Sequence, residues 1–224
     1  MQIAIPLFDR FTAQDAVGPY QVLSAIPGAS VRFTGPEPGP LKTDNRMLTV
    51  LVEERWEDLP DPDVLVVPGG IGTRALLRDE RMLDWVRGAH ATSRWTTSVC
   101  TGSLVLAAAG VLDGVDATTN WLEYELLGEL GACPVRERVV ERGKIMTGAG
   151  VTAGLDMALT LAARLTTAEV AQAIQLGLEY DPQPPFDAGS PDKAPSEIVD
   201  LVRGAVTAMD AEALAEIEAE AAPR

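Results

Sequence analysis

The sequence has little histidine, cysteine or positive charge. It contains one histidine, His90, and two cysteines, Cys100 and Cys133. These are too few for a disulfide framework or for the usual zinc sites, which combine several cysteine and histidine ligands. Lysine and arginine total 18 against 33 aspartate and glutamate residues, which gives a formal net charge of −15. Because cysteine and histidine are so few, we expect no metal site. Nucleic-acid binding needs clustered basic residues, so we also expect no nucleic-acid partner.

Long hydrophobic runs are also missing. No apolar run reaches the roughly 20 residues that a membrane-spanning helix needs. Residues 1–8 lack the basic leader and the small-residue cleavage site of a signal peptide, so we expect a cytoplasmic protein without a membrane partner. The chain of 224 residues is 46% hydrophobic, which is enough for one substantial core. We expect a single domain over 1–224, in which 195–224 forms a helical C-terminal tail.

Short strand patterns alternate with helical patterns along the chain. Residues 64–67 form a continuous apolar run, which is typical of a strand buried on both faces of a parallel sheet. This alternation predicts an α/β fold whose central parallel sheet is covered by helices on both faces. Further strands are expected at 3–7, 30–34, 95–99 and 117–119, paired edge strands at 41–53 and a hairpin at 138–147, with helices at about 12–23, 80–91, 120–130, 153–165 and 166–180.

Cys100 lies at one of the expected strand-to-helix transitions. The β-rich run 95–99 precedes it, and an apolar, alanine-rich helical pattern closed by Gly110 follows. A thiol at the start of a helix faces unpaired N–H groups and the positive end of the helix dipole, which favour the nucleophilic thiolate. The same pattern is compatible with a buried cysteine that fills a corner of the core. Cys133, beside Pro134, is expected to have a structural role.

Asp15 and the pair Gly69-Gly70 follow two other expected strands. Because the carboxyl ends of parallel strands meet at one edge of a sheet, we expect these residues to converge with Cys100. A nucleophile, backbone N–H donors and a carboxyl group are the parts needed to add a thiolate to an electrophilic carbon. Taken singly, Asp15 is also typical of an ordinary residue in a first helical turn, and the glycine pair of a simple turn.

Two short motifs in this region resemble those of the ThiJ/PfpI superfamily. The resemblance extends over nearly the whole chain and implies a class I glutamine-amidotransferase-like fold of the flavodoxin type. This is a three-layer α/β sandwich with a mainly parallel central sheet and the cysteine at a nucleophile elbow. Within the superfamily, the sequence is similar to the isocyanide hydratases. The motifs are Val67-Pro68-Gly69-Gly70 and Ser98-Val99-Cys100-Thr101-Gly102-Ser103, and the similarity to the hydratases lies in Asp15 with Gly18-Pro19, in 117–119, 147–148, 152–154 and 178–180, and most specifically in 184–192.

The resemblance implies roles for four residues. Cys100 is the nucleophile, Asp15 is the acid and base, and the N–H groups of Gly70 and Thr101 flank the reacting atom. The implied reaction is the hydration of an organic isocyanide to an N-substituted formamide through a thioimidate on the cysteine. The resemblance also implies that no cofactor is needed and that the protein is a homodimer. A different use of the same elbow is a non-enzymatic redox sensor or stress protein, in which Cys100 is oxidised to a sulfenic or sulfinic acid.

The sequence departs from the hydratase pattern at two pocket positions. Asn120 stands where a histidine is expected, which removes a possible base, although it also suits the cap of the helix expected at 120–130. Ala149 interrupts what would be three consecutive glycines, and it adds a methyl group near the helix expected beside Cys100. The missing histidine weakens protease, deglycase and glyoxalase III interpretations, which depend on a histidine close to the cysteine.

Overall fold

The computed structural model describes residues 1–221, except for the side chains of 213–214 and 216–221. The chain divides into two compact units, Met1–Tyr180 and Asp181–Arg224. The second unit contains the long helix α8 (Ser196–Ala221), as predicted for the tail, whose last residues, 222–224, lie outside the described part. The single domain over 1–224 stays a prediction.

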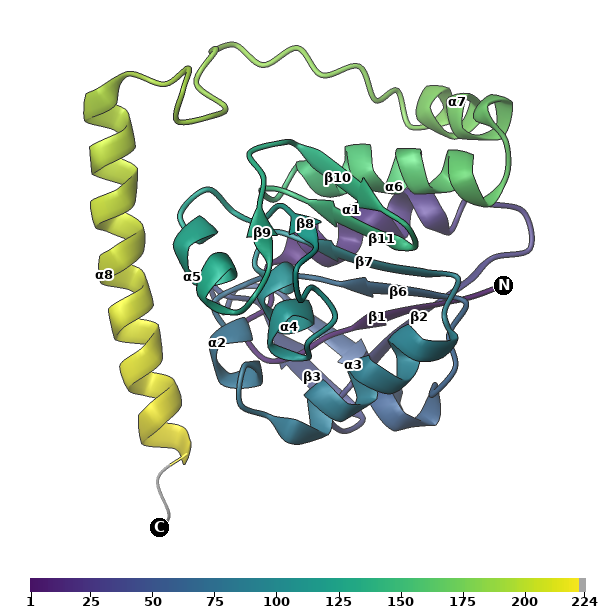
Figure 1. Ribbon diagram of the computed structural model, residues 1–224, viewed down its shortest axis with the longest axis horizontal. Helices are drawn as coiled ribbons and strands as arrows, with labels where there is room; N and C mark the ends of the chain where they lie inside the picture. Colours follow the sequence, from purple (N-terminus) through teal and green to yellow (C-terminus); the bar gives the residue numbers. More distant parts are fainter. Residues whose placement is uncertain (222–224) are drawn as a thin grey trace. The chain divides into compact units, whose positions relative to one another are not determined.

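A seven-stranded sheet forms the centre of the first unit (Figure 1). The strand order is β10-β11-β7-β6-β1-β2-β5, and all neighbours are parallel except β10 and β11. The strands are β1 (Gln2–Pro6), β2 (Ser30–Gly35), β5 (Glu54–Arg55), β6 (Val64–Val67), β7 (Trp95–Val99), β10 (Val139–Arg142) and β11 (Ile145–Gly148). Two small separate sheets pair β3 (Gly39–Lys42) with β4 (Thr49–Val52) and β8 (Asp116–Ala117) with β9 (Cys133–Pro134).

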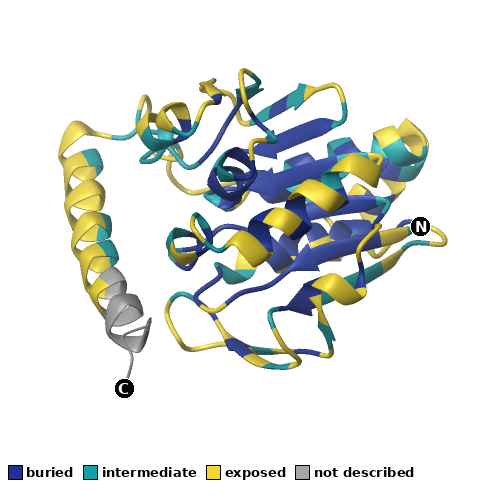
Figure 2. Cartoon of the chain, turned by 60° about the horizontal axis from the view of Figure 1, so that its bottom comes forward, coloured by how far each residue is buried: buried dark blue, intermediate teal, exposed yellow. Residues whose placement is uncertain are grey.

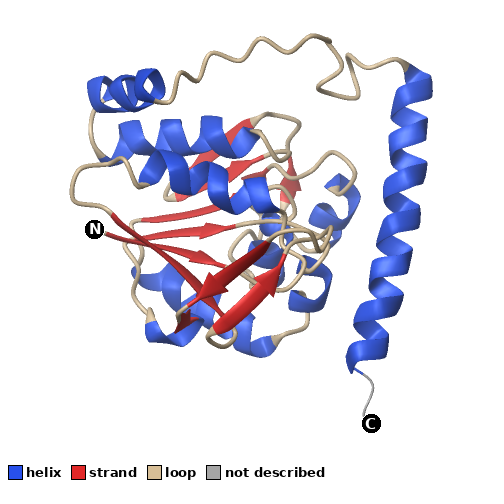
Figure 3. Cartoon of the chain, turned by 180° about the vertical axis from the view of Figure 1, so that it is seen from behind, coloured by secondary structure: helices blue, strands red, loops and turns tan. Residues whose placement is uncertain are grey.

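Helices cover both faces of this sheet (Figures 1 and 3). On one face α1 packs against α6, which also contacts α7, and on the other face α4 contacts α2, α3 and α5. The three-layer α/β sandwich with a mainly parallel central sheet is therefore confirmed. The helices are α1 (Ala13–Leu23), α2 (Thr73–Leu76), α3 (Glu80–Thr92), α4 (Gly102–Ala108), α5 (Tyr124–Glu129), α6 (Ala153–Leu165) and α7 (Ala168–Gly177), with a 3₁₀ turn η1 (Trp56–Asp58).

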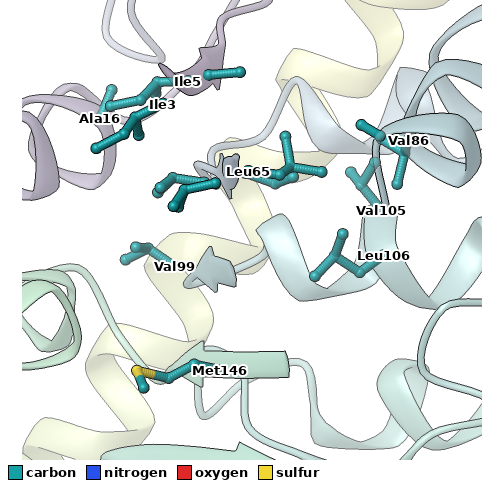
Figure 4. Close-up of a cluster of buried hydrophobic side chains, with 14 of the residues drawn as sticks. Ile3, Ile5, Ala16, Leu65, Val86, Val99, Val105, Leu106 and Met146 are labelled. Carbon is teal, nitrogen blue, oxygen red and sulfur yellow. The ribbon is translucent and has the colours of Figure 1, made fainter. Parts of the chain in front are cut away.

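The core lies between the sheet and its two helical layers. The central strands are largely buried, whereas the helices expose their outer sides (Figure 2). Every residue of β6 is buried, as its continuous apolar run predicts. Figure 4 shows side chains of this core, which include Ile3, Ile5, Leu65, Val99 and Met146 from four adjacent strands, Ala16 from α1, Val86 from α3, and Val105 and Leu106 from α4.

The strand order determines where a site can form. The five inner strands β2-β1-β6-β7-β11 follow the flavodoxin-like order, in which the chain moves outward in opposite directions from the gap between β1 and β6. In sheets of this order the helices that follow these two strands lie on opposite faces, and ligands bind at the carboxyl ends of the strands. Asp15 follows β1, Gly69 and Gly70 follow β6, and Cys100 follows β7, so the predicted convergence at this edge is confirmed.

Several of the expected elements are shorter than predicted, and the helix expected at 166–180 covers only 168–177. The strand expected at 117–119 covers only 116–117. The helix expected at 120–130 begins at Tyr124, and Asn120 does not cap it. Residues 120–123 instead form a turn in which the Asn120 carbonyl accepts the Glu123 N–H at 2.9 Å and the Asn120 Oδ1 accepts the Leu122 N–H at 3.1 Å. Asparagine makes this local turn readily, and here the turn competes successfully with the helix.

The described part of the chain was also searched for membrane-spanning helices and for groups of metal ligands. None of its helices is long and apolar enough to cross a membrane. Among the side chains that the structure describes, no group of three or more histidine, cysteine, aspartate or glutamate residues is placed to hold a metal ion. The cytoplasmic location stays a prediction.

Candidate active site

Cys100 occupies the turn between β7 and α4 with a left-handed backbone, at a φ of +55°. This conformation is uncommon for a residue other than glycine and costs of the order of 1–3 kcal/mol. Three hydrogen bonds hold it in place. The Cys100 N–H donates to the Gly148 carbonyl at 3.0 Å, and the hydroxyls of Ser103 and Thr119 both donate to the Cys100 carbonyl at 3.1 Å. The elbow predicted at Cys100 is therefore present, with its backbone fixed from three sides.

Two glycines let the surrounding chain approach this elbow. A Cβ atom on Gly102 would lie 2.1 Å from the carbonyl oxygen of Val67, and one on Gly69 would lie 2.6 Å from the backbone nitrogen of Thr101. Carbon atoms do not approach backbone atoms this closely without displacing them. Glycine at both positions therefore allows the end of β6 to lie directly against the start of α4.

Asp15 lies in the first turn of α1 and is completely buried. Its Oδ2 accepts the Gly69 N–H at 3.0 Å, and the carboxyl also interacts with the Cys100 thiol. Its Oδ1 receives no N–H or O–H hydrogen bond from the part of the chain that the structure describes. A buried carboxyl oxygen without such a donor is available to a bound molecule or a water.

The two predicted backbone donors behave differently. The Thr101 backbone, which directly follows the cysteine, lowers the pKa of the Cys100 thiol. The Gly70 N–H instead donates to the Thr101 hydroxyl at 2.9 Å, and this hydroxyl lies 3.2 Å from the Gly70 carbonyl, to which it donates. In this structure Gly70 therefore holds Thr101 in place, and its N–H does not point to a free position beside the sulfur.

The two pocket positions singled out in the sequence also differ. The side chain of Asn120 accepts the Leu122 N–H through its Oδ1 at 3.1 Å, and it lowers the pKa of the Cys100 thiol. Ala149 follows β11 and is half-buried, and its N–H donates to the Arg138 carbonyl at 2.9 Å. Ala149 is adjacent to Gly148, whose carbonyl accepts the Cys100 N–H, so it is connected to the elbow through the backbone.

The remaining cysteine and histidine take no part in this arrangement. Cys133 is exposed on β9. His90 lies near the end of α3, and its Nδ1 is 2.9 Å from the hydroxyl of Thr96, which is near the start of β7. Since Cys100 follows the other end of β7, His90 is remote from the elbow.

Comparison with known proteins places this arrangement in a family. A model of the DJ-1/PfpI family matches residues 1–164. The chain belongs to the DJ-1/PfpI family. The isonitrile hydratase of Pseudomonas putida is 48% identical over 203 residues, which cover 91% of this chain and 89% of that protein. The resemblance drawn from the cysteine and glycine motifs is thereby confirmed.

Solved structures of family members share the fold. The crystal structure of a ThiJ/PfpI family protein from Pseudomonas syringae superimposes with a TM-score of 0.89 at 36% identity, covering 95% of this chain and 88% of that chain. DJ-1beta of Drosophila melanogaster superimposes with a TM-score of 0.74 at 22% identity, covering 81% of this chain and 98% of that chain, and this similarity concerns the fold alone. The flavodoxin-like sandwich is therefore common to distant members of the DJ-1/PfpI family.

The ionisation of Asp15 and Cys100 in this DJ-1/PfpI elbow is dominated by burial. Burial raises the pKa of Asp15 to about 7, although the hydrogen bonds from Gly69 and Cys100 lower it and the charge of Asp44 adds a small increase. Burial also raises the pKa of Cys100, and the negative charge of Asp15 raises it further. Hydrogen bonds from Thr101 and Asn120 act in the opposite direction. The start of α4 lowers the pKa of the thiol through Thr101, as expected, but burial outweighs this effect and the net pKa is raised.

These shifts link the two groups through one proton. Since the charge of Asp15 raises the pKa of Cys100, the thiolate forms most readily when Asp15 is protonated. A pKa of about 7 allows the carboxyl to be protonated in part of the molecules near neutral pH. The arrangement can therefore present a thiolate nucleophile next to a carboxylic acid that can donate a proton.

Some residues of the site were not recognised from the sequence as site residues. Ser103 belongs to the cysteine motif and could have been selected, because a hydroxyl three residues after a turn residue often bonds back to its carbonyl. Thr119 lies in the segment 117–119 that resembles the hydratases, but its contact with the Cys100 carbonyl could not be read from that resemblance, and the ion pair between Arg74 and Glu123 comes from segments with no distinguishing pattern. Only the fold brings them to the elbow.

Proposed function

We propose that this protein is an isocyanide hydratase, which converts an organic isocyanide and water to an N-substituted formamide. The observation that carries the proposal is the buried pair of Cys100 and Asp15, in which a thiol and a carboxyl of raised pKa lie in contact. The similarity to the isonitrile hydratase of P. putida over most of both chains supports the same conclusion.

In the first step the Cys100 thiolate attacks the terminal carbon of the isocyanide. A bond forms between Sγ and this carbon, and the carbon takes a proton from the carboxyl of Asp15. The product is a thioimidate with a carbon–nitrogen double bond, and Asp15 is left as a carboxylate. The step needs Asp15 protonated while Cys100 is ionised. Repulsion between the two charges disfavours ionisation of both groups at once, so Cys100 ionises most readily in those molecules in which Asp15 carries the proton.

In the second step water adds across the carbon–nitrogen double bond. The Asp15 carboxylate takes a proton from the water as the hydroxyl attacks the carbon, and it then returns this proton to the nitrogen. The carbon–sulfur bond breaks as the carbonyl forms, and the hydroxyl proton passes to Asp15. The formamide is released with the thiolate and the protonated carboxyl restored, so water is the only co-substrate.

One carboxyl group acts in both directions in this scheme. General acid–base assistance is typically worth roughly 10²–10⁴-fold in rate, or about 3–5 kcal/mol of the barrier. The free Oδ1 of Asp15 supports this role, because Oδ2 is occupied by the Gly69 N–H.

The redox-sensor interpretation has less support. Cysteines that are oxidised readily are exposed and have a low pKa. Cys100 is only 5% exposed, and burial raises its pKa. The hydratase has the better support because its reaction requires contact between the thiol and a small substrate and does not require an exposed thiol of low pKa.

A formamide-product assay tests the proposed function. Reduced protein is incubated with a panel of alkyl and aryl isocyanides, and the formamides are quantified against a Cys100→Ala variant. We expect many equivalents of product for at least one member of the panel with the wild type and none above background with the variant. Absence of product from every isocyanide would refute the proposal.

A further inference from the structure

Two of the segments that resemble the hydratases, 152–154 and 178–180, take no part in the proposed reaction, and the structure brings them together at the start of α6. Asp156 lies in the first turn of this helix. Its Oδ1 accepts the Tyr180 hydroxyl at 2.8 Å, and its Oδ2 accepts the Nε–H of Arg138 in an ion pair. Both oxygens of the Asp156 carboxylate therefore hold neighbouring segments to α6.

Tyr180 is directed to α6 by a turn at the end of α7. Glu179 has a left-handed backbone, with a φ of +49°, which residues other than glycine rarely adopt. Gln175 of α7 holds the next residue on both sides, because its carbonyl accepts the Tyr180 N–H at 3.1 Å and its side-chain amide donates to the Tyr180 carbonyl at 3.1 Å. The Tyr180 side chain therefore reaches Asp156 from a fixed backbone.

Arg138 connects the same carboxylate to the segment that supports the elbow. Its carbonyl accepts the Ala149 N–H at 2.9 Å, and the carbonyl of the preceding residue, Gly148, accepts the Cys100 N–H at 3.0 Å. Its guanidinium also donates to the Thr152 hydroxyl at 3.3 Å. Arg138 therefore holds both ends of the loop between β11 and α6.

The start of α6 packs against the backbone segments of both reactive groups. A Cβ atom on Gly154 would lie 3.1 Å from Cγ1 of Val99, the residue before Cys100, and 3.5 Å from Cδ of Pro19, which belongs to the same helix as Asp15. Such close packing leaves little room for α6 to shift without moving the end of β7 or α1. A change in the position of α6 is therefore passed on to the cysteine and to the carboxyl.

We propose that Asp156 is a positioning residue that fixes the start of α6 through Tyr180 and Arg138, and thereby holds Cys100 and Asp15 in place for the reaction. Asp156 acts through the packing of α6. The part of this proposal that concerns turnover rests on the proposed isocyanide hydration, whereas the part that concerns access to the thiol does not.

A second ion pair between the same parts of the chain provides a matched control. Glu141 of β10 pairs with Arg164 in the last turn of α6, at the far end of the helix. The side chains of Arg164 and Glu141 are 52% and 32% exposed, and those of Arg138 and Asp156 are 52% and 31% exposed. Because exposed pairs contribute little to global stability, loss of either should lower the melting temperature slightly and by a similar amount. The two pairs differ in the end of α6 that they hold.

The first experiment measures the rate of alkylation by iodoacetamide as a function of pH, without any isocyanide, in a Cys133→Ser background that leaves Cys100 as the single thiol. Loosening the start of α6 exposes the buried thiol more often, and weaker burial also lowers its pKa. We expect Asp156→Asn and Arg138→Gln to react roughly 2–5-fold faster at neutral pH, since an exposed ion pair shifts a local opening equilibrium by about that factor.

Two further variants complete this comparison. Arg138→Lys keeps the charge and should have a profile close to that of the wild type, and so should the control Arg164→Gln. Equal alkylation profiles in Asp156→Asn and Arg164→Gln would overturn the proposal. If Asp156→Asn does not fold, Arg138→Gln takes its place, because it breaks the same pair and leaves the carboxylate for Tyr180.

The second experiment compares turnover in the same variants. We expect kcat/KM for an isocyanide that the wild type accepts to fall roughly 2–5-fold in Asp156→Asn and Arg138→Gln, with the fall mainly in kcat, because misplaced reacting groups slow the chemical step. Turnover in Arg164→Gln should be unchanged, and an equal fall in this control would contradict the proposal. If the wild type hydrates no isocyanide, the proposed function fails, while the alkylation profiles still decide whether Asp156 positions the elbow.

A double-mutant cycle tests whether Tyr180 acts through Asp156. Tyr180→Phe removes only the hydroxyl, and we expect it to speed the alkylation of Cys100 when Asp156 is present. In an Asp156→Ala background the same substitution should have no further effect, because the acceptor of the hydroxyl is already gone. Additive effects of the two substitutions would show that Tyr180 does not act through Asp156 and would overturn this part of the proposal.

Discussion

Asp15 and Gly69 are joined by a hydrogen bond of 3.0 Å from the Gly69 N–H to Oδ2, although 54 residues separate them in the chain. The bond fixes one carboxyl oxygen and so determines where the other points. Its donor belongs to the same short loop as Gly70, which binds the Thr101 hydroxyl. A single loop after β6 therefore orients both the carboxyl and the residue that follows the cysteine.

Replacement of Asp15 by asparagine separates its proton transfer from its packing. The asparagine side chain would keep an oxygen for the Gly69 N–H but could neither donate nor accept the proton that hydration requires. We expect Asp15→Asn to lose most turnover, by roughly 10²–10⁴-fold. Because the charge of Asp15 raises the pKa of Cys100, the thiol of the variant should be alkylated at least as fast as that of the wild type. Near-normal formamide production by Asp15→Asn would remove Asp15 from the mechanism.

The pKa of Asp15 also predicts a pH-dependent stability. The folded value of about 7 lies above the ordinary value of 3.8, so the folded state binds this proton more tightly than the unfolded state. The contribution is fully present below about pH 4 and is lost as the pH rises through about 7, and the gap between the two values corresponds to about 4 kcal/mol. Urea unfolding at pH 4, 6 and 8 should show Asp15→Asn gaining stability relative to the wild type by up to this amount. A difference that does not change with pH would contradict the raised pKa.

The location of the site could be predicted from the sequence because it depends on local patterns. A β-rich run followed by a helical one places Cys100 at an elbow, and the glycines after 64–67 mark the end of a second strand. Parallel strands then bring these ends to one edge of the sheet. Asp15 was found by the same reasoning, since it follows the first strand.

The electrostatics and the hydrogen-bond partners could not be predicted in this way. The pKa of Cys100 depends on how completely other elements cover it, and no local pattern reports that. The Gly70 N–H could donate to a substrate or to the Thr101 hydroxyl. The relative placement of β6 and α4 determines that it donates to the hydroxyl. Asn120 suits both a helix cap and a turn, and the residue before it, Thr119, is held by a hydrogen bond to the Cys100 carbonyl, 19 residues away, that no local pattern reveals.

The close approach at Gly102 predicts a severe effect of a single methyl group. Gly102→Ala would place Cβ 2.1 Å from the Val67 carbonyl oxygen, so β6 and α4 must separate. We expect a lower melting temperature and a large loss of turnover, since the shift also displaces Thr101. Gly88→Ala is the control, because Gly88 lies in α3 with no atom within 4 Å of an added Cβ. That variant should be stabilised by roughly 0.5–1 kcal/mol. Equal effects of the two substitutions in thermal unfolding would contradict this account.

The resemblance to the hydratases predicts a homodimer, and charge restricts where its interface can lie. The second unit is acidic in its helix, with Glu197, Asp200, Asp210 and Glu212, so contact between two such helices is electrostatically unfavourable. We expect the interface on more apolar helices, such as α1, where Val17 and Tyr20 are 37% and 36% exposed. Sedimentation at micromolar concentration should give the mass of a dimer, and a monomer under these conditions would contradict the prediction.

A catalytic Cys100 must be regenerated in every cycle, whereas a sensing cysteine reports by staying modified. We expect reduced protein to hydrate many equivalents of isocyanide and both Cys100→Ser and Cys100→Ala to abolish turnover. Cys133→Ser should leave turnover unchanged, because Cys133 is exposed on β9, which pairs with β8 and not with the strands that lead to the elbow.

Peroxide treatment completes this test. Oxidation alone cannot distinguish the two roles, because a thiolate that forms in a pocket reacts with peroxide whatever its function. We expect turnover to fall in proportion to the fraction of Cys100 oxidised, as measured by mass spectrometry, and the burial of Cys100 should make this oxidation slower than that of an exposed thiol such as Cys133. Ala149→Gly should alter the rate or the choice of isocyanide without abolishing turnover, since Ala149 neither attacks nor donates a proton. If reduced protein makes no formamide while oxidation of Cys100 changes the binding of a partner, Cys100 is a sensor.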